Sequence, residues 1–184
     1  MAVTRRNNQI SKPTSINQND YWQIAGELTM SGWEGSPSIA QIIGDNENLS
    51  YIKAFCEYAE FMESFSNPNA SYTLFLPDNS SIQLEGKFLK SITDAEGVDV
   101  IKDLLKNHVF DGVITPDILN QIRTVNITSI NSSSFTIIEK NIDGFTKKIL
   151  QWQIDNVIKE AQIKTPQGIK ANNGIIFVID HMLY

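Results

Sequence analysis

The chain reads NNGIIFVIDHML over residues 172–183, just before its last residue, Tyr184. Five apolar residues follow Gly174 without a break, and Asp180 then interrupts the run before more apolar residues. Glycine after asparagine suits a tight turn because glycine readily adopts a positive φ. An unbroken apolar run of this length is typical of a strand buried on both faces. The sequence therefore predicts an interior strand over residues 175–179 that closes the fold and carries no catalytic group.

Helical periodicity dominates the chain before residue 124. The most regular pattern lies between Asn48 and Phe65, where apolar residues recur mostly at three- and four-residue steps and acidic residues fall off that stripe. Ser38 is suited to cap a shorter helix, and Pro116 stands at the first position of another, where its missing N–H is tolerated. The predicted helices cover residues 38–43, 48–65, 98–106 and 116–123.

Extended structure is predicted for most of the remaining chain, where the period changes from about 3.6 to 2 residues. Turn residues at 131–134, 143–144 and 155–156 separate segments that alternate in polarity or carry β-branched residues. The predicted strands cover residues 72–76, 124–130, 135–140, 145–153 and 157–164, in addition to the closing strand. Helices followed by a strand meander indicate an α+β fold, with helices packed beside an antiparallel sheet or sandwich.

Composition indicates one globular domain with a real core, since 41% of the 184 residues are apolar and 20% are charged. The formal net charge is −6 and the pI is about 4.9, which argues against a general nucleic-acid binder. The single cysteine, Cys56, excludes an internal disulfide, and its place in an apolar helical pattern predicts a buried side chain.

The N-terminal residues differ from the rest. We expect residues 1–36 to form a polar arm and residues 37–184 to form the domain. The arm carries two tryptophans, which are unfavourable to leave in water, so we expect it to lie on its own domain or on a neighbouring chain. The leading hypothesis is that it binds a neighbouring protein. Its candidate contact residues are Arg5, Arg6, Tyr21, Trp22 and Trp33.

The chain shows no segment that predicts export or membrane insertion. Its first 20 residues lack the apolar stretch of a signal peptide, and no window approaches the roughly 18 apolar residues of a membrane span. Five Asn-X-Ser/Thr sequons begin at Asn48, Asn69, Asn79, Asn126 and Asn131. Without an export signal, we expect them to be unused.

Three segments in this order resemble the fasciclin-type domain family. Residues 72–79 (YTLFLPDN) are similar to the first box of that family, residues 107–110 (NHVF) to its central histidine box, and residues 173–180 (NGIIFVID) to its terminal box. The resemblance covers roughly residues 37–183 and implies an adhesion or protein–protein interaction module. Two departures are Asn107, where integrin-binding members are associated with tyrosine, and Ile169-Lys170, where an acidic–aliphatic pair is usual.

Structural roles are expected for the residues of these boxes. Thr73, Phe75 and Pro77 are expected to form an edge strand and end it, because proline lacks a ladder donor. Asn79 is expected to brace the next turn, and His108 to be a hydrogen-bonded structural histidine. Asp180 is expected to accept hydrogen bonds at the end of the closing strand. The remaining motif residues are Asn173, Gly174 and Ile179.

The sequence favours a protein that is not an enzyme. No nucleophile with a base, glycine-rich phosphate loop or metal-ligand spacing is present, so we expect no catalytic residue, no cofactor and no metal. A third reading, an enzyme or small-ligand carrier, requires a deep pocket near His108.

Two functional hypotheses remain. The first is a minor capsid or cement-type subunit of a large DNA virus, made in the host cytoplasm and located in the virion, with other proteins of the particle as its partners. The alternative is a cell-surface or extracellular-matrix adhesion domain. Neither predicts a nucleic-acid partner or membrane insertion.

Overall fold

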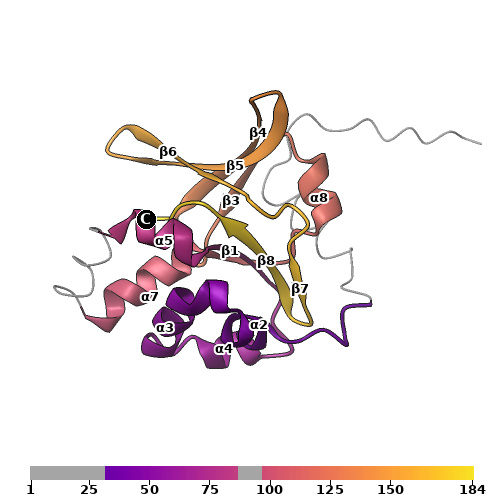
Figure 1. Ribbon diagram of the computed structural model, residues 1–184, viewed down its shortest axis with the longest axis vertical. Helices are drawn as coiled ribbons and strands as arrows, with labels where there is room; N and C mark the ends of the chain where they lie inside the picture. Colours follow the sequence, from indigo (N-terminus) through magenta and orange to yellow (C-terminus); the bar gives the residue numbers. More distant parts are fainter. Residues whose placement is uncertain (1–31, 87–96) are drawn as a thin grey trace, which may run out of the picture.

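The computed structural model describes residues 32–86 and 97–184, and in this part the chain forms two sheets and a set of short helices (Figure 1). Helices α2, α3, α4 and α7 pack below one sheet, whereas the second sheet lies above it with α8 at its side (Figure 1). In chain order the helices are α2 (Ile39–Asp45), the 3-10 turn η1 (Glu47–Leu49), α3 (Ser50–Tyr58), α4 (Met62–Ser66), α5 (Asn79–Leu84), α7 (Val98–Asn107) and α8 (Pro116–Gln121).

Side chains set several of the helix starts. Ser38 and Gln41 form a capping box at the start of α2. Asp78 accepts a hydrogen bond from the N–H of Ser81 at the start of α5, and Thr115 caps α8 ahead of Pro116. Each cap satisfies a backbone N–H that has no partner inside its helix, so these starts are encoded locally.

The single helix predicted over residues 48–65 is wrong, because this stretch forms η1, α3 and α4 in succession. Glu60 adopts a φ of 61°, and the N–H of Phe61 bonds the carbonyl of Cys56 at 2.8 Å. This six-to-one bond past a left-handed residue is the Schellman ending of a helix. Glycine usually occupies that position, so Glu60 does not indicate in the sequence that a helix ends there.

The first sheet has the strand order β2-β1-β8-β7. Its strands are β1 (Tyr72–Pro77), β2 (Val109–Asp111), β7 (Ile169–Ala171) and β8 (Gly174–Ile179). All six residues of β8 are buried, which confirms the prediction of an interior closing strand. Two expectations are wrong: β1 is not an edge strand, since it lies between β2 and β8, and the sheet is mixed, since β1 and β8 run parallel.

The second sheet is an antiparallel meander with the order β3-β4-β5-β6. Its strands are β3 (Thr124–Thr128), β4 (Ser134–Ile142), β5 (Phe145–Ile154) and β6 (Val157–Gln162). The predicted turns are confirmed: residues 143–144 have φ values of 53° and 80°, and residues 155–156 have 49° and 65°. Two successive positive φ values define the hairpin turn that matches strand twist.

Apolar residues form two clusters in the described part of the chain, one on each face of the first sheet. Phe75 and Phe177 point towards the second sheet and α8, whereas Leu74 and Ile176 point towards α2, α3 and α7. This division follows the alternation of side chains along β1 and β8. Both faces of β8 are therefore covered, which is why it reads as a continuous apolar run.

A buried lysine joins α8 to the second sheet. Lys148 on β5 donates to the carbonyl oxygens of Ile122 and Asn120 and forms an ion pair with Glu139 at 2.8 Å. Because the last carbonyls of a helix lack intrahelical partners and carry negative partial charge, the ammonium group stabilises this end of α8. The helix ends at Gln121, two residues before the predicted end.

Candidate functional site

The residues of the terminal box tie β8 to the helices. Asn173 is fully buried; its Oδ1 accepts from the N–H of Ile39 at 2.9 Å, and its Nδ2 donates to the carbonyls of Phe65 and Asn67 at 2.8 and 3.0 Å. One amide thus connects α2, the end of α4 and the following loop to the start of β8. Its hydrogen-bonding groups are used within the protein, so it is not available to a ligand.

Gly174 is required by close backbone packing. Its φ is 153°, and a Cβ at this position would lie 2.2 Å from the carbonyl oxygen of Tyr72. Tyr72 is the first residue of β1 and pairs with Gly174 in the parallel ladder. The glycine therefore permits β1 and β8 to approach each other.

The first box lies inside the sheet. Thr73 is buried; its hydroxyl donates to the carbonyl of Gly112 and accepts from the N–H of Ile114, both at 2.8 Å. The ring of Phe75 stacks on Phe177 at a centroid distance of 5.5 Å and meets Phe110 edge-on at 5.4 Å. These residues hold β1 against β2, β8 and the loop after β2.

His108 lies at the end of α7 and is fully buried. Its Nε2 accepts from the N–H of Leu183 at 2.9 Å, so the ring proton lies on Nδ1, which donates to the carbonyl of Leu104 at 2.9 Å. Burial lowers the pKa of His108 to about 4, so the ring is neutral at pH 7. Its two nitrogens join α7 to the C-terminal segment.

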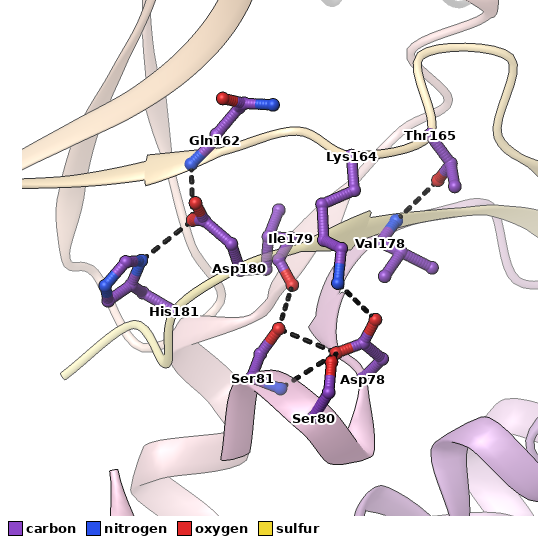
Figure 2. A network of polar contacts seen from close by, with 10 residues as sticks. All are labelled: Asp78, Ser80, Ser81, Gln162, Lys164, Thr165, Val178, Ile179, Asp180 and His181. Atoms are coloured by element: carbon purple, nitrogen blue, oxygen red, sulfur yellow. Dashed lines mark hydrogen bonds and ion pairs between the residues drawn. The ribbon is translucent and has the colours of Figure 1, made fainter. Parts of the chain in front are cut away.

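A polar cluster of converging side chains lies at the ends of β1 and β8 (Figure 2). Asp78 follows β1; its Oδ1 accepts from the N–H of Ser81 at 2.9 Å and from the hydroxyls of Ser80 and Ser81 at 2.7 Å each. Its Oδ2 forms an ion pair with Lys164. Burial alone raises the pKa of Asp78, but the hydrogen bonds from Lys164 and the serines outweigh it and hold this pKa well below its usual range.

Asp180 continues this cluster beyond β8. Its Oδ1 accepts from the N–H of Gln162 at 2.7 Å and contacts Nδ1 of His181 at 2.8 Å (Figure 2). The N–H of Asp180 in turn donates to the carbonyl of Gln162 at 3.2 Å. Asp180 thus joins the end of β8 to the end of β6, across the two sheets. Its neighbour Ile179 is buried and pairs with Pro77, the last residue of β1.

Asn79 differs in detail from the expectation, because Asp78 caps α5 and Asn79 reaches to another helix. Its Oδ1 accepts from the N–H of Tyr51 at 3.2 Å, and its Nδ2 donates to the carbonyl of Glu47 at 2.8 Å and to the Ser50 hydroxyl at 2.9 Å. Asn79 therefore fastens α5 to the start of α3. This contact spans the fold and has no local signal.

The N-terminal arm is only partly described. Arg5, Arg6, Tyr21 and Trp22 lie outside the described residues. Trp33 packs partly buried against the cluster between the sheets, and the ammonium of Lys170 lies 5.3 Å from the centre of its ring. Trp33 therefore contacts its own domain, and its binding to a partner stays a prediction.

The described residues contain no group of three or more histidine, cysteine, aspartate or glutamate side chains placed to hold a metal ion. Cys56 is buried as predicted, and desolvation raises the pKa of its thiol to about 12, so it is not a nucleophile at neutral pH. Two surface pockets of about 280 and 370 Å³ are lined by residues of α8, β4, β5, β6 and the segments that follow β6 and β8, and not by His108. No helix in the described ranges is long and apolar enough to cross a membrane.

The sequons differ in exposure. Asn48, Asn69 and Asn126 are exposed. The amide nitrogens of Asn79 and Asn131 instead donate hydrogen bonds, Asn131 to Asp103 and Asn107. That all five are unused stays a prediction.

Sequence reasoning missed Lys164 and Ser81 in the polar cluster and the exposed pair Val157-Ile158 on β6. Asp78 followed by three hydrogen-bonding side chains is an N-cap signal and could have located part of the cluster. Lys164 lies 86 residues from Asp78, so only the fold brings the pair together. The apolar pair Val157-Ile158 directly follows the turn at residues 155–156, and the sequence pattern there predicts only a strand.

These boxes, the mixed sheet and the helices beside it define a domain of the fasciclin class. The fasciclin domain model matches residues 47–184, so the chain belongs to the fasciclin domain family, and the predicted resemblance is confirmed. Domains of this family are generally non-catalytic interaction modules. No curated protein sequence matched the chain.

Among solved structures, the chain is similar to a FAS1 domain pair from the insect cell adhesion molecule Fasciclin I, with a TM-score of 0.62 and 18% sequence identity. The similarity covers 80% of this chain and 51% of that one, so this chain spans about half the length of that structure. At this identity the likeness concerns the fold, and it confirms the α+β prediction.

Proposed function

We propose that this chain is a non-catalytic adhesion module that acts by binding other proteins through its surface. The observation that carries the proposal is that the motif side chains of the family are used inside the domain. Thr73, His108 and Asn173 are fully buried and hydrogen-bonded to the backbone of other elements. Side chains that hold the scaffold in this way leave recognition to exposed residues.

The adhesion alternative has more support than the capsid hypothesis. The family model is that of an interaction module, and the similar solved structure is from a cell adhesion molecule. Neither these comparisons nor the described residues favour a virion component. The location implied by the proposal is the cell surface or the extracellular matrix, with proteins as partners.

Attachment of coated beads to cells tests this proposal. Beads carrying the full chain, immobilised through an N-terminal tag, are incubated with cultured animal cells before and after brief trypsin treatment, with albumin-coated beads as the control. We expect several-fold more attachment than with albumin, and its loss after trypsin removes the surface proteins. Attachment equal to albumin, or unchanged by trypsin, would contradict a protein-binding function.

A further inference from the structure

The register between β6 and β5 determines which backbone groups of β6 point away from β5. The two-residue turn at 155–156 makes Ile154 and Val157 a hydrogen-bonded pair, and pairs then alternate between bonded and non-bonded along the ladder. Val157, Lys159 and Ala161 therefore direct their backbone groups to β5. Ile158, Glu160 and Gln162 direct theirs away from it.

Only one of these three outward-facing residues has a backbone partner among the described residues. The N–H of Gln162 donates to the carboxylate of Asp180 (Figure 2), and its carbonyl accepts from the N–H of Asp180, so Asp180 covers the edge at this position. The outward N–H and C=O of Ile158 and Glu160 have no such partner in the described ranges. β6 is the outer strand of its sheet, and the β5–β6 hairpin stands clear of the helices (Figure 1).

Two apolar side chains lie exposed at the start of this edge strand, before the charged residues Lys159 and Glu160. Val157 is 53% exposed and Ile158 is 65% exposed. Natural proteins protect free edges with charges, prolines or bulges, and an exposed apolar edge marks a place for strand pairing. Beside it lies the pocket of about 370 Å³ whose lining includes Trp152, Lys159 and Tyr184.

The charged side chains of β6 indicate which side chains an added strand would carry. Lys159 shares a sheet face with its pair Trp152, and its ammonium lies 6.0 Å from the ring centre of Tyr184. It interacts electrostatically with Glu85 but forms no ion pair within 4 Å with the described residues. Glu160, on the other face, is already bound by Lys140 and Gln151. An incoming side chain opposite Lys159 is therefore favoured as an acid, and one opposite Ile158 as apolar.

We propose that the free edge of β6 is a docking site for an extended segment of a partner protein, which adds a strand beside Ile158–Glu160 with an acidic residue opposite Lys159 and apolar residues flanking it. Main-chain hydrogen bonds supply affinity in this mode, and alternate side chains supply specificity. The inference rests on the proposed function and names the surface that would perform it.

A second copy of the chain fits this edge less well. A symmetric antiparallel pair that uses the free groups of both Ile158 and Glu160 in each copy must have its axis at Lys159. That register places Lys159 directly opposite Lys159 of the other copy, and like charges in opposed positions are destabilising. The partner is therefore expected to be a different segment.

A synthetic peptide tests the proposal on the full chain. The probe is acetyl-Ser-Lys-Val-Glu-Val-Thr-Lys-Ser-amide, and its control has the same side chains but N-methyl groups on the two valine nitrogens. We expect the probe to bind and to slow hydrogen exchange at the amides of Ile158 and Glu160, and the methylated control not to bind.

Two variants separate the backbone from the side chain. Ile158→Pro removes the outward N–H without removing a bond to β5, whereas Ile158→Thr keeps the N–H and loses only apolar surface. We expect about tenfold or greater weakening for Ile158→Pro and a smaller loss, about threefold, for Ile158→Thr. Thermal melting of each variant tests whether it is folded. Glu160→Pro provides the same backbone test at the neighbouring free position.

Four results would overturn the proposal. The first is that the probe does not bind, and the second is that the wild type and both proline variants bind it equally. The third is slow hydrogen exchange at the amides of Ile158 and Glu160 in the free chain at every protein concentration. The fourth is exchange at these amides that slows as the protein concentration rises. The third would show that the chain covers its own edge, and the fourth that a second copy does. Bead attachment keeps the two proposals distinguishable: attachment retained by Ile158→Pro refutes this edge alone, whereas wild-type beads that fail to attach refute the adhesion function.

Discussion

Gly174 shows how one residue constrains the fold. It stands where the parallel ladder between β1 and β8 begins, and the carbonyl of Tyr72 occupies the space of a Cβ. Asn173, directly before it, bonds to three separate backbone groups of the helical layer. The Asn-Gly pair thus serves two requirements at once, since the amide positions the helices and the missing side chain admits β1.

Substituting Gly174 by alanine tests the close approach. Gly174→Ala places a Cβ against backbone that cannot move without separating β1 and β8, so we expect the free energy of unfolding to fall by about 3 kcal/mol or more. Gly144→Ala is the matched control, because Gly144 has a φ of 80° but nothing within 4 Å of a Cβ. We expect about 1 kcal/mol there, from backbone conformation alone. Urea unfolding measures both, and equal losses would contradict the steric explanation.

At the scale of elements, the C-terminal segment after β8 is fastened to three others. Leu183 bonds His108 at the end of α7, Met182 bonds Glu85 after α5, and the carbonyl of Tyr184 accepts from Trp152 on β5. The His108 contact depends on a neutral ring, because Nε2 must accept a hydrogen bond. The junction between α7 and this segment is therefore sensitive to acid.

The pH dependence of stability tests that junction. An unfolded histidine takes up a proton near pH 6.5, whereas folded His108 does so near pH 4. Between these values the unfolded state binds more protons, so stability is lost as pH falls from about 6.5 towards 4, by about 2 kcal/mol between pH 6.5 and 5. Urea unfolding across this range measures the loss. We expect His108→Gln to be less stable at pH 7 but to lack most of this slope; an unchanged slope would assign the effect to other groups.

Local signals predicted most elements but not their partners. The hairpin turns, the Ser38 cap and the start of α8 after Pro116 follow from residues next to one another, so the sequence located them. The parallel pairing of β1 and β8 has no local signal, because 96 residues separate Pro77 at the end of β1 from Gly174 at the start of β8. The proline at the end of β1 instead predicts an edge strand. The end of α3 was missed because glutamate at position 60 takes the conformation expected of glycine.

Local signals likewise located some residues of the candidate site and missed others. The three boxes located Thr73, His108 and Asn173, and the resemblance indicated that they belong to one fold. Asp78 with Lys164, and Lys148 with the last carbonyls of α8, depend on contacts between distant segments. The edge of β6 required the strand register, since the direction of each backbone group follows from the pairing with β5 and not from composition.

At the scale of the whole molecule, the described residues form a buried framework around β1 and β8 and, at one margin of the second sheet, an open strand edge. β1 and β8 lie between the helices and the second sheet, and the family motifs serve to hold these layers together (Figure 1). β6 lies at the margin of the second sheet, where the outward backbone groups of Ile158 and Glu160 have no partner among the described residues. A domain of this construction is expected to present partners with a rigid edge and not with a catalytic pocket.

Hydrogen exchange of every backbone amide in the isolated full chain tests this division most directly. Amides of the interior strand open only with global unfolding, whereas unpaired edge amides exchange freely. We predict that the slowest exchange occurs at Ile175–Phe177, and that Ile158 and Glu160 exchange at nearly the rate of an unfolded chain at all protein concentrations. Fast exchange within β8, or strong protection of Ile158 and Glu160 in the absence of a partner, would contradict the account.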